Sequence, residues 1–212
     1  MDITLYYAPD ACSLVPYVTL TEADAAFEVR PLDLMKGEQR SPEYARLNPK
    51  HKVPLLVVNG LALSENVAIQ IWIARNFPRA GLLPDDPWKE LNAISLMAWF
   101  ASGIHPYLTR IFAPSRVCDV AGAPERVRKL AEAPLLEGYR LADGMLAGRE
   151  FFFEHFTAAD AYFFWCFRRG MALGLDLSCF PNCKGHFRRM SDRASVRKMV
   201  AYEEAVRQHA RV

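Results

Sequence analysis

Up to about residue 77, short apolar runs alternate with stretches in which apolar residues recur every three or four positions. The short runs have the length and composition of strands, and they lie at 3–7, 27–31, 55–58 and 61–63. The stretches with helical spacing predict helices at 13–23, 42–47 and 65–77. Asn59 and Gly60 separate the last two strands, and this pair suits the positive φ angles of a type I′ hairpin turn. The pattern therefore predicts a small α/β domain with the element order βαβαββα.

Beyond residue 87 the strand patterns give way to long amphipathic stretches. The segment 78–87 between the two patterns contains three prolines and a glycine, and neither a helix nor a strand continues easily through it. The helices predicted after it lie at 87–112, 124–146, 157–173, 183–192 and 195–207. We therefore expect a first domain at 1–78, a linker at 79–87 and an all-helical domain at 88–212.

One pair of polar residues in the helical half has a structural explanation. Thr157 and Asp160 have the spacing of a capping box, in which the two side chains bond each other's backbone at a helix start. The helix that follows is the most apolar in the chain. We interpret the pair as the cap of a core helix and not as catalytic residues.

The composition limits the partners that this protein is expected to have. The chain has 212 residues, with 26 Lys and Arg against 24 Asp and Glu and a formal net charge of +2, so its charge indicates no nucleic-acid partner. Its apolar stretches are too short to span a bilayer, so no membrane partner is expected. The five cysteines are scattered, and the residues after Met1 do not resemble a secretory signal. These features favour the reducing cytoplasm.

No metal cofactor is expected from the cysteines and histidines. The densest group consists of Cys179, Cys183 and His186. It offers only three ligands, and their spacing differs from that of structural zinc sites.

Two positions in the first half have candidate chemistry. Cys12 stands where a predicted strand ends and a helix begins, and the N–H groups and dipole of a helix start favour a thiolate. A cysteine there can also pack as a small buried residue. Val53-Pro54 precedes the predicted hairpin, where a cis bond would leave the Val53 backbone free to pair with an extended ligand, although a trans proline opening an edge strand is the commoner arrangement.

Three separated segments carry a resemblance to a known family: 5–14 (LYYAPDACSL), 48–55 (NPKHKVPL) and 156–162 (FTAADAY). Together with the order of the elements, they resemble the cytosolic glutathione transferases, and most closely the bacterial beta-type members. The resemblance covers the whole chain. It implies a thioredoxin-like N-terminal domain, an all-α C-terminal domain, a cis Val53-Pro54 bond and a homodimer.

The resemblance also implies a binding site for glutathione as cosubstrate. A carboxylate suits the ammonium group of glutathione, and Glu65 is expected to supply it. Asn66 and the N–H groups at the same helix start are expected to bind the neighbouring carboxylate. Val53 is expected to pair with the cysteinyl backbone. The other residues expected to contact glutathione are Cys12, Lys36, His51, Lys52, Pro54, Ser102 and His105.

Two mechanisms at the sulfur of glutathione remain open. The residues expected there are Tyr6, Cys12, Ser13 and His105. In one mechanism, the helix start and the Ser13 hydroxyl stabilise the glutathione thiolate. In the other, Cys12 forms a mixed disulfide, although Val15 leaves no C-x-x-C partner to resolve it. A hydrophobic electrophile is expected against Trp99, Tyr107 and Ile111.

The expected function is therefore that of a homodimeric cytoplasmic glutathione transferase. It would conjugate the activated thiol of glutathione to hydrophobic electrophiles, a detoxification activity. A second hypothesis is glutathione-dependent disulfide exchange or peroxide reduction through Cys12. A third is a binding or regulatory protein that has the fold without the activity.

Overall fold

The computed structural model describes residues 1–209, and the chain divides into two compact units. The first unit combines Met1–Asp85 with the chain from Ser191 onward, and the second is Asp86–Met190. The last helix therefore belongs with the first unit, whereas the sequence analysis placed it in the helical domain.

The first unit is built on a four-stranded sheet. Its strands are β1 (Ile3–Tyr7), β2 (Glu28–Pro31), β3 (Leu55–Val58) and β4 (Leu61–Ser64), in the order β2-β1-β3-β4. The pair β1–β2 is parallel, and the other two pairs are antiparallel. The helices of this region are α1 (Leu14–Glu22), α2 (Pro42–Leu47) and α3 (Asn66–Asn76), with 3-10 turns at Glu38–Arg40 and Pro78–Ala80. The predicted thioredoxin-like order βαβαββα is confirmed.

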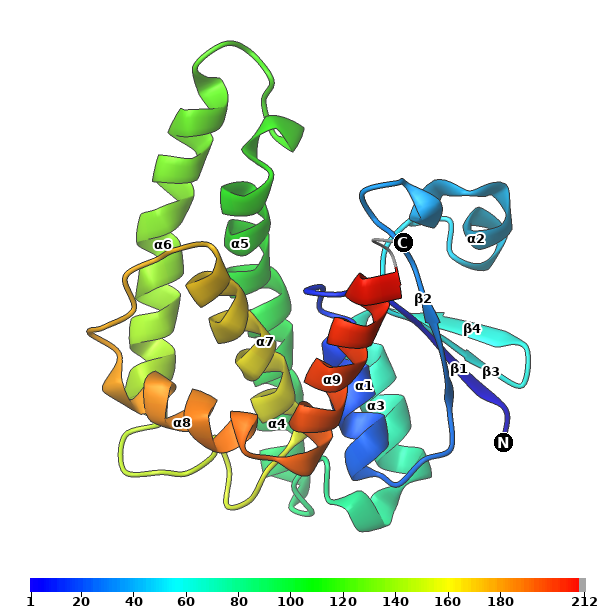
Figure 1. The fold of residues 1–212 in the computed structure, drawn as a ribbon. Helices are drawn as coiled ribbons and strands as arrows, with labels where there is room; N and C mark the ends of the chain where they lie inside the picture. The colour runs from blue at the N-terminus through cyan, green and yellow to red at the C-terminus, as the bar shows by residue number, and fades with distance from the viewer. Residues whose placement is uncertain (210–212) are drawn as a thin grey trace. The chain divides into compact units, whose positions relative to one another are not determined.

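Successive side chains of β1 point to opposite faces of the sheet, and this decides which helix packs against each of them. Tyr7 is buried, and its ring packs against Tyr17 of α1 with 5.7 Å between the ring centroids. The neighbouring Tyr6 points the other way and packs against Tyr44 of α2, 5.3 Å between centroids. Helices α1 and α3 lie side by side against one face of the sheet (Figure 1).

Two local predictions around β3 are confirmed. Asn59 and Gly60 have φ angles of 48° and 83°, as a type I′ turn requires at both positions. The Val53-Pro54 peptide bond is cis, as the resemblance implied.

Helix α9 (Ala194–His209) lies along α1, which explains why it belongs to the first unit (Figure 1). The Tyr202 ring lies 5.5 Å from Tyr7 and 5.4 Å from Tyr17, centroid to centroid. At the other end of α9, Arg193 donates two hydrogen bonds to the Glu22 carboxylate, at 2.9 and 2.7 Å. Burial alone would raise the pKa of Glu22, but the hydrogen bonds from Arg193 and Ser195 hold it below its usual value.

The second unit is helical. Its helices are α4 (Pro87–Trp99), α5 (His105–Phe112), α6 (Ala123–Met145), α7 (Ala158–Ala172) and α8 (Pro181–Ser191), with a 3-10 turn at Pro114–Arg116. The sequence predicted one helix over 87–112, but a π-helical turn at Phe100–Ile104 separates α4 from α5. Pro106 follows this turn and has no N–H to continue the α-helical ladder, which accounts for the widened turn. Helix α7 packs against α4 and α5.

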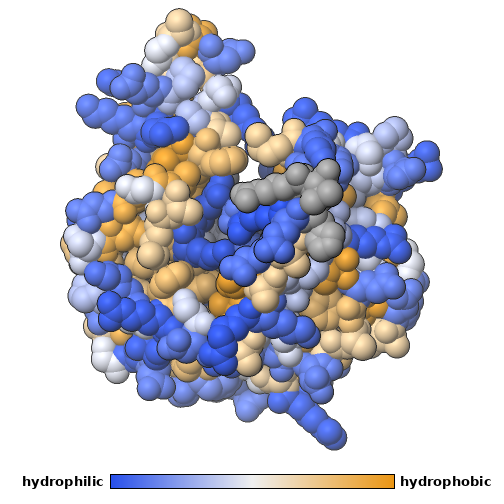
Figure 2. Space-filling model, viewed as in Figure 1, coloured by the Kyte–Doolittle hydropathy of each residue, from blue (hydrophilic) through white to orange (hydrophobic). Residues whose placement is uncertain are grey.

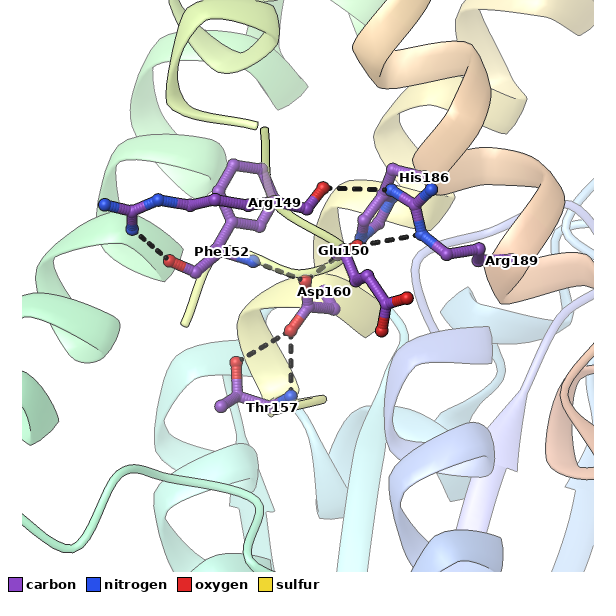
Figure 3. Close-up of polar contacts among 7 residues, drawn as sticks. All are labelled: Arg149, Glu150, Phe152, Thr157, Asp160, His186 and Arg189. Carbon is purple, nitrogen blue, oxygen red and sulfur yellow. Dashed lines mark hydrogen bonds and ion pairs between the residues drawn. The ribbon is translucent and has the colours of Figure 1, made fainter. Parts of the chain in front are cut away.

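Asp160 caps α7 and holds the preceding loop, as Figure 3 shows. Its Oδ2 accepts from Thr157 N at 2.8 Å and from Thr157 Oγ1 at 3.0 Å. Its Oδ1 accepts from Phe152 N at 3.1 Å and lies 3.0 Å from Nε2 of His186 on α8. The predicted capping box is confirmed, and the fully buried carboxylate serves the fold.

The two cysteines of the densest cysteine and histidine group have different environments. Cys183 donates its S–H to the Tyr139 carbonyl at 3.7 Å, and Cys179 is exposed. In the part of the chain that the structure describes, no three His, Cys, Asp or Glu side chains are placed to hold a metal ion.

The face of the molecule drawn in Figure 2 is mixed in character. Figure 2 shows hydrophobic residues scattered among hydrophilic ones, including at the tip where α5 leads into α6. No helix among residues 1–209 is both long enough and apolar enough to cross a bilayer.

Candidate active site

The structure brings Cys12 and Val53 together from distant parts of the sequence. Cys12 follows the loop after β1 and precedes Ser13, the residue that caps α1. Its side chain is buried, with 8% of the residue exposed. The thiol donates a hydrogen bond to the Val53 carbonyl oxygen, with 3.6 Å between Sγ and that oxygen. Thus the cysteine lies directly beside the cis Val53-Pro54 segment.

Burial controls the protonation of Cys12. Removal from water raises the pKa of this thiol to about 12, and the backbone N–H at the helix start and Lys52 lower it by less. The thiol is therefore protonated at neutral pH. The helix start lowers the pKa of the thiol, as the sequence indicates, but in this structure desolvation outweighs it.

Ser13 is committed to the loop that precedes it. Its hydroxyl accepts from Ala8 N at 3.0 Å and donates to Ala8 O at 3.1 Å. A hydroxyl stabilises a thiolate by donating a hydrogen bond, and the single O–H of Ser13 already donates to a backbone oxygen. The side chain is fully buried, so this arrangement does not support the predicted role at the sulfur.

Tyr6 lies on the other side of the sheet from α1. Its hydroxyl is 3.4 Å from Nη1 of Arg30 on β2, and its ring packs against Tyr44 of α2. Because neighbouring strand residues face opposite sides, only Tyr7 points toward α1, the helix that Cys12 precedes. The geometry does not support a hydrogen bond from Tyr6 to the sulfur.

Glu65 and Asn66 begin α3 in different environments. Glu65 has a φ of 74° and an exposed side chain, which pairs with Lys50 at 2.7 Å. Asn66 is buried, and its Nδ2 donates to the Cys12 carbonyl at 2.9 Å. Its Oδ1 has no hydrogen-bond partner among the described residues. Asn66 therefore supports the backbone of Cys12, while Glu65 presents a carboxylate to solvent.

Lys50 is missing from the site residues predicted from the sequence. Lys50 also donates to Ser64 Oγ at 3.0 Å, so it bridges the turn before Val53 and the start of α3. The signal that could have found it is its place beside His51 and Lys52, in the same polar turn. An exposed pair such as Lys50–Glu65 contributes little stability, and a charged ligand can replace either partner.

The three expected cations are exposed and lie in two loops. Lys36 lies 3.7 Å from the Asp33 carboxylate in the loop after β2. His51 has a φ of 54°, and its Nδ1 lies 3.1 Å from the Gln39 carbonyl oxygen, which joins that loop to the turn before Val53. The Lys52 carbonyl accepts from Tyr44 Oη at 2.6 Å, which fixes the backbone that leads into Val53.

Ser102 and His105 lie in the second unit, at the π-helical turn and at the start of α5. The Ser102 hydroxyl donates to the Ala98 carbonyl at 2.9 Å within the helix. Nδ1 of His105 lies 3.2 Å from Tyr162 Oη, and its ring centroid lies 4.3 Å from that of Trp165. Such π-helical turns are frequent at functional sites. The roles predicted for the two residues at glutathione remain predictions.

The three residues expected to bind an electrophile have different environments. Trp99 lines a cavity of about 590 Å³ between α4 and the loop after α6, together with Leu96 and Phe152. Ile111 is a core residue with 2% exposure. Tyr107 is half-buried and lies under the Arg110 guanidinium, 5.0 Å from its ring centroid. Their role as a substrate surface remains a prediction.

The chain is similar to proteins of one family. The family described as "Glutathione S-transferase, N-terminal domain" matches residues 1–75. Glutathione S-transferase GST-4.5 of Xanthomonas campestris pv. campestris is 32% identical over 201 residues, which are 94% of this chain and 98% of the relative.

Solved structures of glutathione transferases are also similar to this chain. A glutathione transferase homolog from Sulfitobacter with bound glutathione has a TM-score of 0.88 and 25% identity, over 94% of this chain and 97% of that one. The bacterial beta class enzyme of Sphingomonas chungbukensis has a TM-score of 0.84 and 28% identity, over 94% and 98%. These findings confirm the resemblance that the sequence motifs indicated.

Proposed function

Because this chain belongs to the glutathione S-transferase family, we propose that it binds glutathione in its first unit and conjugates the thiol to hydrophobic electrophiles. The observation that supports this most is the cluster formed by Cys12, Val53 and Asn66 beside Glu65. Glutathione has one ammonium group, two carboxylates, peptide groups and a thiol. The cluster offers a partner of suitable chemistry for the ammonium group, the γ-glutamyl carboxylate, the peptide groups and the thiol, and the exposed Lys36, His51 and Lys52 lie in the neighbouring loops.

The γ-glutamyl end of glutathione would bind at the start of α3. The exposed Glu65 carboxylate would exchange its Lys50 partner for the ammonium group of the ligand. The unpaired N–H groups at the start of this helix would bind the neighbouring carboxylate. The backbone of Val53 would pair with the cysteinyl part, and Lys36, His51 and Lys52 would surround the glycyl carboxylate.

The protonated state of Cys12 favours conjugation over thiol exchange. With its pKa raised to about 12, Cys12 keeps its proton. Its S–H donates to the Val53 carbonyl in this structure, and it would donate to the thiolate of bound glutathione once the ligand's backbone pairs with Val53. The glutathione sulfur then attacks the electrophilic carbon, and the leaving group departs with the bonding electrons. Disulfide exchange would require Cys12 itself to become a thiolate, which its burial opposes.

The experiment that tests this function measures binding and turnover together. Wild-type protein should bind glutathione in isothermal titration calorimetry and conjugate it to a chloronitrobenzene. Glu65→Gln should weaken binding by about 10- to 100-fold, as expected for loss of a charge-assisted hydrogen bond. The exposed Glu43→Gln, on α2, is the matched control and should bind as wild type does. Absence of glutathione binding by the wild type at millimolar concentration would refute the proposal.

A homodimer is the second part of the proposal. Several large apolar side chains are exposed on two helices of the second unit: Trp88 (72%) and Leu91 (56%) on α4, and Leu130 (61%), Leu141 (50%) and Met145 (46%) on α6. Exposed apolar residues gathered on particular helix faces are typical of interfaces. We expect these two helices to pack against a second copy of the chain.

The dimer is tested by light scattering after gel filtration. The wild type should have twice the chain mass of 24.0 kDa. Leu91→Glu should shift it toward the monomer, because a buried unpaired charge opposes association. Met171→Glu replaces another exposed apolar residue, on α7, and should leave the dimer intact. A wild type that is monomeric at micromolar concentration would contradict this part.

A further inference from the structure

The loop that leads to Cys12 contains a residue in an uncommon conformation. Asp10 has a φ of 61°, in the left-handed region that residues other than glycine rarely adopt. It stands two positions before Cys12 in the loop after β1. A conformation of this kind persists only where the surrounding structure holds it.

Glu203 of α9 supplies that support from the far end of the chain. Its carboxylate is fully buried, and its Oε1 accepts from Asp10 N at 2.9 Å and from Tyr7 Oη at 2.6 Å. Nη2 of Arg207 lies 2.7 Å from Asp10 Oδ1 and 3.5 Å from Glu203 Oε2. A buried carboxylate is stable only when its oxygens are paired. Here the loop supplies Asp10 N as a donor to Glu203, and α9 supplies the acceptor for Asp10 N and the Arg207 partner of the Asp10 carboxylate.

The two ends of α9 have different contacts. At the first end, Arg193 and Ser195 bind Glu22 on the last turn of α1. At the other end, Glu203 and Arg207 bind the loop that leads to Cys12. Both ends fasten α9 to the first unit, but only the second reaches the backbone next to the thiol. A comparison of the two ends therefore separates anchoring of the helix from positioning of the loop.

We propose that Glu203 is a positioning residue for the sulfur site, which holds Asp10 in its left-handed conformation and thereby keeps the Cys12 side chain against the Val53 carbonyl. Release of Asp10 N lets the loop return to a commoner φ, which redirects the chain before Cys12 and exposes its thiol. The consequence for conjugation rests on the proposed function. The consequence for the exposure of Cys12 does not.

The test is the rate at which iodoacetamide labels Cys12, followed by mass spectrometry of the peptide that contains it. Glu203→Ala removes both acceptor oxygens and should raise the rate at least tenfold. Glu203→Gln keeps one carbonyl acceptor and should raise the labelling rate by less. If the alanine variant does not fold, the glutamine variant still tests the proposal. Glu22→Gln and Tyr7→Phe are the controls. Each removes a polar contact within the first unit while Asp10 N keeps its Glu203 acceptor, so both should label within twofold of wild type.

The outcomes separate the inference from the proposed function. If the Glu203 variants label Cys12 no faster than Glu22→Gln of matched melting temperature, Glu203 only anchors α9, and the inference is overturned. In an active enzyme, Glu203→Gln should also raise the KM for glutathione more than it lowers kcat, and Glu22→Gln should change neither. Fast labelling in the Glu203 variants of a protein that does not bind glutathione would support the inference and refute the proposed function.

Discussion

The protonation of Cys12 is the property on which the proposed chemistry most depends, and a direct titration measures it. The thiol pKa rises from 9.0 to about 12 on folding because the side chain loses its contact with water. A difference of this size corresponds to about 4 kcal/mol, at 1.36 kcal/mol for each unit. The folded state holds the proton more tightly than the unfolded state does. The free energy of unfolding is therefore unaffected by this group below about pH 9 and falls as the pH rises from there toward 12.

The assay is the thiolate absorbance at 240 nm, taken as the difference between wild type and Cys12→Ser from pH 5 to pH 10. The difference spectrum should show no step over this range, because the thiol of residue 12 keeps its proton. In urea the same pair should show a step near the ordinary pKa of 9.0. A step in the folded protein with a midpoint below pH 8 would show that the helix start outweighs burial, and thiol exchange through Cys12 would then be the better hypothesis.

Three further predictions concern the fold that holds the site. Asp160→Asn should lower the free energy of unfolding by about 2–5 kcal/mol in guanidinium titrations, because at least two of the four donors around this buried carboxylate lose their acceptor. The exposed Asp176→Asn should cost less than about 1 kcal/mol, and equal effects would contradict the role of the cap. Gly103→Ala should destabilise by about 1–3 kcal/mol, since its Cβ would lie 2.7 Å from Trp99 Cδ1. Gly144→Ala on α6 meets no atom within 4 Å and should be neutral or slightly stabilising, so a matching loss there would refute the steric argument. The Glu22 contacts should stabilise the protein above about pH 4.5 and weaken as the pH falls through the lowered pKa, whereas Glu22→Gln should flatten that part of the pH profile of stability.

Local interactions made much of this fold predictable. The hairpin turn depends on the φ angles of Asn59 and Gly60 alone, and the start of α7 depends on two side chains three residues apart. Strand and helix positions followed from the spacing of apolar residues, because each element buries one face whatever its neighbours are. The segments around Cys12 and Val53 could be assigned to one site only through the resemblance to a family.

The features that could not be predicted from the sequence depend on contacts between distant residues. The sequence alone predicted a helix near residues 195–207, but its place beside α1 depends on Tyr202 and on the pairing of Arg193 with Glu22, more than 170 positions away. The presence of Ser13 was plain from the sequence, whereas the hydrogen bond that its hydroxyl donates to the Ala8 carbonyl depends on the folded loop. The type of residue at position 12 was likewise given, but its pKa depends on how much water the folded chain removes. The loss of hydration depends on every atom packed around the sulfur, and the pattern of residues along the chain does not show which atoms those are.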